Sequence, residues 1–169
     1  MDGELLKEDI SSLIGVLEKE RDSYQELLDR AREEQQIILE GNMDELPPMV
    51  KTVEELVCRT RDIEKERLEL LDSISADLQS PQKIESLSQL IAHMDPSSSR
   101  ELDRLQDLQK GISQIANDLA TTNRANSDML RRNLGYIDFL FSLLAGDEQA
   151  YPGTSDKKTV SSKLFDQRI

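Results

Sequence analysis

A nearly continuous heptad pattern from Ser97 to Leu144 constrains the fold of this chain more than any other stretch of its sequence. Apolar residues recur three and four positions apart, which places them on one face of a helix that packs against other helices. A helix of this length is roughly 70 Å long at about 1.5 Å per residue. The stripe comprises Leu105, Leu108, Ile112, Ile115, Leu119, Met129, Tyr136, Leu140 and Leu143. We therefore predict an elongated protein organised around this long helix.

The rest of the chain favours further helices over strands. Charged residues make up 33% of the sequence and aromatic residues 4%, and the apolar residues are mainly Leu and Ile at helical spacing. All five prolines and three of the seven glycines lie around residues 41–48, 79–96 and 146–153, where we expect breaks between helices. With 169 residues, the chain is expected to form one domain.

The first two predicted helices form a hairpin. The first covers about residues 4–40 and ends at Gly41, which suits a left-handed C-terminal cap. Asn42 is expected to cap a short helical turn. Two consecutive prolines then fit the first turn of a second helix over residues 47–78. Because the connection is short, the two helices are predicted to lie antiparallel.

Two glutamates interrupt the apolar stripe of the first helix. Glu20 and Glu34 occupy two of its ten heptad positions, so this helix does not match a tight two-stranded coiled coil. We expect both carboxylates to reach past the edge of a partner helix into solvent.

The second half of the chain is predicted to contain one short and one long helix. The short helix covers residues 81–93 with Ser80 as its N-cap, and the long helix covers residues 97–144. Residues 1–145 would form one all-α domain, an elongated antiparallel bundle or coiled coil of long helices with one short helix. Residues 146–169 are expected to form a flexible C-terminal tail. Three apolar residues of this tail lie at helix-like spacing: Val160, Leu164 and Phe165. They would line one side of a short amphipathic segment formed on binding.

The net charge of −13 is unevenly distributed. Residues 1–78 contain 22 acidic and 10 basic residues, a net charge of −12, whereas residues 79–145 contain 8 and 7, a net charge of −1. An acidic chain repels nucleic acid and anionic membranes, so neither is an expected partner. The apolar runs are shorter than the ~20 residues that span a bilayer, which argues against membrane insertion. The N-terminus lacks the pattern of a secretory signal, so we expect a cytoplasmic protein.

The sequence offers no constellation typical of catalysis, metal binding or cofactor binding. The single histidine, His93, has no second imidazole with which to share a metal ion, and the single cysteine, Cys58, has no nearby histidine to activate it. The glycines are scattered singly and form no phosphate-binding loop. We therefore predict that the protein is not an enzyme and needs no cofactor.

Two features of the long helix remain as candidate functional sites. Thr122, Asn126 and Asn133 place polar groups at its seam, where they either set the register of helix packing or hydrogen-bond a bound peptide. The segment from Tyr136 to Leu144 is apolar nearly all the way round the helix. It is covered by the N-terminal hairpin or by a second copy of the chain, or it is a surface that binds a partner.

Two stretches carry a resemblance to a known family. The first consists of Leu13, Leu17, Glu18, Arg21, Tyr24, Leu27, Leu28, Ala31, Gln35, Ile38, Gly41, Asn42 and Leu46. The second consists of Asn123, Asn126, Met129, Leu130, Leu134, Tyr136 and Ile137, followed by Tyr151 and Gly153. In this order and spacing, over roughly residues 5–153, the chain resembles FlgN, the family of bacterial flagellar export chaperones.

The resemblance implies a function in flagellar assembly. Members of this family are cytoplasmic chaperones of the hook-associated proteins, the subunits of the hook–filament junction; they prevent premature assembly and deliver these subunits to the flagellar type III export apparatus. The family binds its substrates through the C-terminal region. The candidate partner-binding residues are therefore Asn126, Met129, Leu130, Asn133, Leu134, Tyr136, Ile137, Phe139, Leu140, Phe141, Leu143, Leu144 and Tyr151. The alternative is a structural scaffold that dimerises as a coiled coil and has no export substrate; a homodimer remains open in either case.

Overall fold

The computed structural model describes residues 2–78, 84–94 and 99–145, with side chains for residues 6–78, 84–94 and 100–141. The elements are α1 (Asp2–Glu40), the 3₁₀ turn η1 (Met43–Glu45), α2 (Leu46–Asp77), α3 (Leu87–His93) and α4 (Ser99–Ala145). The described residues contain no strand, so the predicted all-α fold is confirmed. The predicted tail, residues 146–169, lies outside the described part of the chain.

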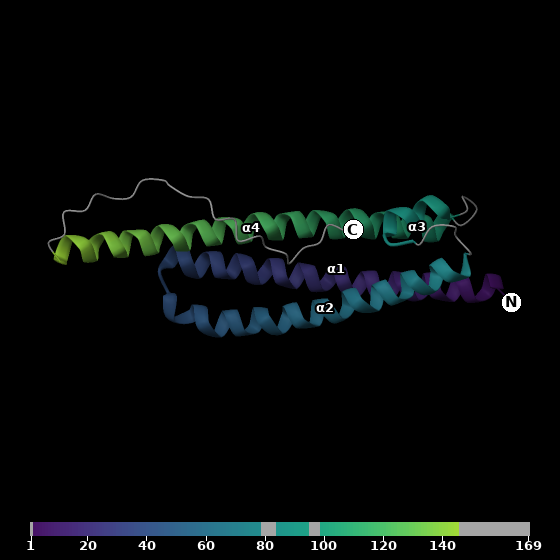
Figure 1. Ribbon diagram of the computed structural model, residues 1–169, viewed down its shortest axis with the longest axis horizontal. Coiled ribbons are helices and arrows are strands. Elements are labelled where there is room, and N and C mark those ends of the chain that lie inside the picture. The colour runs from purple at the N-terminus through teal and green to yellow at the C-terminus, as the bar shows by residue number, and fades with distance from the viewer. Residues whose placement is uncertain (1, 79–83, 95–98, 146–169) are drawn as a thin grey trace.

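The centre of the fold is α1, because it packs along both α2 and α4, whereas α2 and α4 hardly approach each other. Figure 1 shows that α2 returns antiparallel to α1 and that α4 runs in the same direction as α1. The prediction that the longest helix organises the protein was therefore wrong in one respect. The longest helix covers one side of α1, and α1 is the element that both other long helices share.

The core is one continuous cluster of buried apolar side chains from all four helices. Its fully buried members include Leu13 and Leu17 of α1, Leu71 and Ile74 of α2, Leu87 and Leu90 of α3, and Leu105, Leu108 and Ile112 of α4. In α4 the predicted stripe is buried from Leu105 to Leu119, except for Ile115, which is half-buried. Beyond Leu119 it emerges from the core.

The turn between α1 and α2 agrees with the sequence at Gly41 and differs at Asn42. Gly41 has φ +76°, the left-handed conformation expected of a C-terminal cap. The Asn42 side chain does not cap the following turn, and its amide nitrogen lies 3.1 Å from a carboxylate oxygen of Glu40. With no side-chain cap, the next residues form the single 3₁₀ turn η1. The two prolines stand in the first turn of α2, as predicted.

The short helix α3 begins at Leu87 and not at Pro81. Ser86 is its N-cap, and the Ser86 hydroxyl accepts a hydrogen bond from the Gln89 backbone N–H. Ile84 cannot belong to the helix because its own N–H donates to the Ser75 hydroxyl of α2, at 3.0 Å, and its side chain is in the core. The predicted cap Ser80 lies outside the described residues.

A buried polar network joins α1 to α2 and corrects the expectation for Glu20. The Glu20 side chain is only 1% exposed, and one of its carboxylate oxygens lies 3.4 Å from Nε of Arg67. Nearby, the Tyr24 hydroxyl donates to Glu64 at 2.6 Å. Glu20 points into the hairpin because Arg67 of α2 faces it there and supplies a positive charge. Burial, and to a lesser degree the charge of Glu64, raise the pKa of Glu20 to about 7 against the opposing effect of Arg67.

Candidate partner-binding site

The C-terminal end of α4 projects beyond the rest of the bundle, as Figure 1 shows at the yellow end of the chain. Asn126 of α4 lies against Ala31 and Glu34 of α1. From this level α1 continues for 6 residues and α4 for 19. The difference of 13 residues corresponds to about 20 Å of helix that has no α1 beside it. We call this segment, residues 133–145, the α4 overhang.

The described side chains of the α4 overhang are mostly exposed. Five large apolar residues are between 39% and 66% exposed: Leu134, Tyr136, Ile137, Leu140 and Phe141. Asn133 is also exposed, and Phe139 is half-buried. For Leu143 and Leu144 only the helical backbone is described, and Tyr151 lies outside the described residues. The predicted apolar cluster therefore exists as an exposed surface in this chain, and the N-terminal hairpin does not cover it.

The α4 overhang continues the face by which α4 packs on α1. Steps of three and four residues lead from the buried Asn126 to Ile137 and Leu140, so these side chains point in the direction in which α1 would lie if it were longer. Leu134 and Phe141 lie on one flank of this line and Tyr136 on the other. One helix placed end-on to α1 would contact all of these residues.

Asn126 belongs to the packing of α1 on α4 rather than to the exposed surface. It is 2% exposed, and its amide nitrogen lies 2.8 Å from the Ala31 carbonyl and 3.1 Å from the Glu34 carboxylate. These hydrogen bonds fix the register between the two helices. A partner therefore reaches Asn126, one of the predicted partner-binding residues, only if the two helices separate.

Two other predicted partner-binding residues, Met129 and Leu130, lie between the buried Asn126 and the exposed overhang. Both are half-buried.

The seam residue Thr122 does not reach across to α1, since its hydroxyl donates to the Asp118 carbonyl one turn earlier in α4. Of the three polar seam residues, only one therefore sets register across a helix pair.

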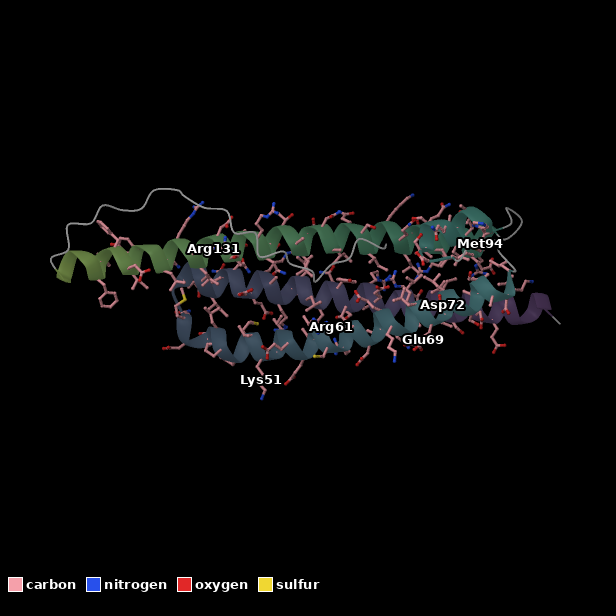
Figure 2. All side chains as sticks on the ribbon, viewed as in Figure 1. Lys51, Arg61, Glu69, Asp72, Met94 and Arg131 are labelled. Atoms are coloured by element: carbon pink, nitrogen blue, oxygen red, sulfur yellow. The ribbon has the colours of Figure 1, made fainter. Side chains whose placement is uncertain are left out.

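An exposed apolar surface at the tip of the hairpin was missed in the sequence. Leu39, Met43 and Val50 are all exposed there, at the end of the hairpin above which the α4 overhang begins (Figure 1). Arg131, labelled in Figure 2, marks this level on α4. The available signal was the run Ile37-Ile38-Leu39, which is wider than one helical stripe needs. Exposed apolar side chains are therefore found both at the tip of the hairpin and on the α4 overhang.

The described residues hold neither a candidate metal site nor a candidate membrane-spanning helix. Within them, no three His, Cys, Asp or Glu side chains gather in a way that could hold a metal ion. None of the helices in this part of the chain is long and apolar enough to cross a membrane.

The family described as FlgN protein matches residues 1–158. No curated protein and no solved structure matches the chain. The FlgN family is known as a family of flagellar export chaperones. Since the match spans almost the entire sequence, the chain belongs to the FlgN family.

Proposed function

We propose that this chain is a cytoplasmic chaperone that binds hook-associated subunits through the α4 overhang. It keeps these subunits from assembling early and delivers them to the flagellar type III export apparatus. The observation that carries the proposal is the continuation of the α1-facing side of α4, through Ile137 and Leu140, past the end of α1. Membership of the FlgN family supports the export role, and the exposed apolar face supports the place of binding.

The proposed mode of binding is helix-in-groove docking. A helical segment of the subunit lies end-on to α1 and occupies the side of α4 that α1 leaves free. Its other apolar contacts are with the hairpin tip at Leu39 and Met43. Because a segment masked in this way cannot pair with another subunit, binding prevents assembly.

The exposed apolar area of the α4 overhang limits the free energy that docking can gain. Burying a large apolar side chain completely stabilises by ~1.5–3 kcal/mol, and the five overhang residues have about half of that still to gain. The gross gain is then ~4–8 kcal/mol, from which ordering and association costs are subtracted. Since a dissociation constant of ~1 μM corresponds to ~8 kcal/mol, the overhang alone gives weak binding. Contacts at the hairpin tip add to it, and a modest affinity suits a chaperone that must release its cargo.

The test replaces Ile137 by Asp and Leu140 by Arg together in the full chain. Binding of purified hook-associated subunits is measured by calorimetry, and helicity by circular dichroism. The double variant should lose binding and keep its helicity, because both side chains are exposed on a projecting helix. The matched control is Leu68→Arg, since Leu68 of α2 is 43% exposed and Ile137 is 46% exposed. The control should bind like the wild type; unchanged binding by the double variant refutes the proposal.

Light scattering separates this role from that of a dimeric scaffold. If the chain is an obligate dimer that Ile137→Asp with Leu140→Arg converts to a monomer, the overhang is a self-association surface and the chaperone proposal is wrong. A wild-type monomer with the binding behaviour above supports the chaperone.

A further inference from the structure

An apolar groove lies between α2 and α4, with α1 as its floor. It encloses about 240 Å³ and is lined by apolar side chains of all three helices. Its apolar lining residues are Tyr24, Leu27 and Ala31 of α1, Val53 and Val57 of α2, and Leu119 of α4. Val53 and Val57 are half-buried. The groove is distinct from the α4 overhang, because Leu119 lies about four turns before the overhang begins.

At the opposite end of the bundle the corresponding space between α2 and α4 is bridged. The Ile84 N–H donates to Ser75 of α2, and the Gln109 side chain of α4 donates to the Ser88 hydroxyl of α3 at 2.6 Å. Ile84 and Leu90 are fully buried there. Residues 84–94 thus bridge α2 and α4 at that end of the bundle, and no described segment of the chain does so at the groove.

We propose that the groove is a docking site for residues 157–169 of the same chain, which form the fourth helix at this end of the bundle. These residues lie outside the described part of the chain, and their sequence is the first argument. Val160, Leu164 and Phe165 have the spacing of one helical face. Three large apolar side chains match the size of an apolar groove that no described segment fills.

Charge is the second argument. Residues 157–169 contain four basic residues and one acidic residue, a net charge of +3, in a chain whose net charge is −13. Residues 1–78, which include the α1 and α2 walls of the groove, have a net charge of −12. Glu34 and Glu64 lie at the groove itself, together with Arg61 of α2, which is labelled in Figure 2. Basic side chains beside an apolar face therefore meet an acidic surface beside an apolar groove.

Chain length is the third argument. From Ala145, the end of α4, back to Asn123 at the groove is 22 helical residues, about 33 Å. Residues 146–156, which precede the proposed helix, supply 11 residues and span up to ~36–40 Å when extended. The connection is long enough to bring residues 157–169 over Val57 without moving α4.

The single cysteine gives a direct test. Cys58 is exposed on α2 beside Val57 of the groove, so a nitroxide attached to the native thiol is a unique paramagnetic probe. In the full-length, isotopically labelled chain, the amide signals of residues 157–169 should lose intensity and regain it when the nitroxide is reduced. Substituting Leu164→Asp and Phe165→Asp should abolish this loss, and high salt should weaken it.

Two outcomes overturn the proposal. One is a loss of intensity no larger in the wild type than in the double variant. The other is a loss that appears only when a nitroxide-labelled chain is mixed with a separate isotopically labelled chain, because the occupant is then a second copy. The double variant changes only residues outside the described core, so a folding failure does not confuse the result. No export partner is present, so the outcome is independent of the proposed function.

Discussion

Replacing Glu20 by Gln tests whether a buried carboxylate makes the stability of the hairpin depend on pH. Glu20 is almost completely buried between α1 and α2, and its pKa is raised from 4.5 to about 7. Burial is the main cause; Arg67 of α2 lowers the pKa, and Glu64 of α2 raises it. Glutamine keeps the shape of the side chain and cannot ionise.

The sign of the effect follows from proton linkage. A raised pKa means that the folded protein binds this proton more tightly than the unfolded chain does. The contribution to stability is complete below pH 4.5 and is lost as the pH rises through about 7. With about 1.4 kcal/mol per pKa unit, the contribution of Glu20 to the free energy of unfolding should fall by about 2 kcal/mol between pH 5.5 and 8. This range also avoids the isoelectric point near 4.5, where an uncharged protein tends to precipitate.

The assay is urea denaturation followed by circular dichroism at several pH values, for the wild type and Glu20→Gln. The variant should be destabilised relative to the wild type at pH 5.5 by about 2 kcal/mol more than at pH 8. Arg67→Met should make the pH dependence steeper, since it removes the positive charge that lowers the pKa of Glu20. Parallel pH profiles for wild type and Glu20→Gln would show that the carboxylate is hydrated, and would refute the reasoning.

Two further predictions concern α4 and use the same urea assay. Leu119→Ala should destabilise by ~2–5 kcal/mol because Leu119 is 2% exposed, whereas Leu134→Ala, at 61% exposed, should change stability by less than ~0.5 kcal/mol. Equal losses at both positions would mean that the α4 overhang is covered. Asn126→Ala should cost ~1–3 kcal/mol, because it removes the buried hydrogen bonds from the Asn126 amide to the Ala31 carbonyl and to the Glu34 carboxylate, and Asn133→Ala should be close to neutral. A neutral Asn126→Ala would argue against its role in helix register.

Periodicity predicted the helices because each long helix buries one face. The stripe from Leu105 to Leu119 was recognised correctly since a buried helical face requires apolar residues every three or four positions. Gly41 was equally predictable, because a left-handed backbone is strained for residues with a side chain. These features depend on local geometry alone.

The parts that sequence reasoning missed depend on which helix faces which. A heptad position shows that a residue faces a neighbour, but it does not identify the neighbour. Glu20 looked like a solvent-exposed carboxylate because Arg67, its counter-charge, is 47 residues away in sequence. The start of α3 was misplaced because the hydroxyl of Ser75 takes the Ile84 N–H, a contact that no local capping rule contains. The central position of α1 likewise follows only from how three helices divide the core.

The exposure of the α4 overhang follows from the different end points of α1 and α4, and its helicity follows from the packing of the preceding turns of α4 on α1. An isolated helix of about 13 residues is marginal in water, since nucleation is costly. Here the preceding turns of α4 are held on α1, so nucleation is already complete and each further residue only extends a formed helix. The chain thereby presents Ile137 and Leu140 in helical geometry before any partner arrives. A docking helix then loses little free energy to ordering this surface, which favours binding through a short projecting segment.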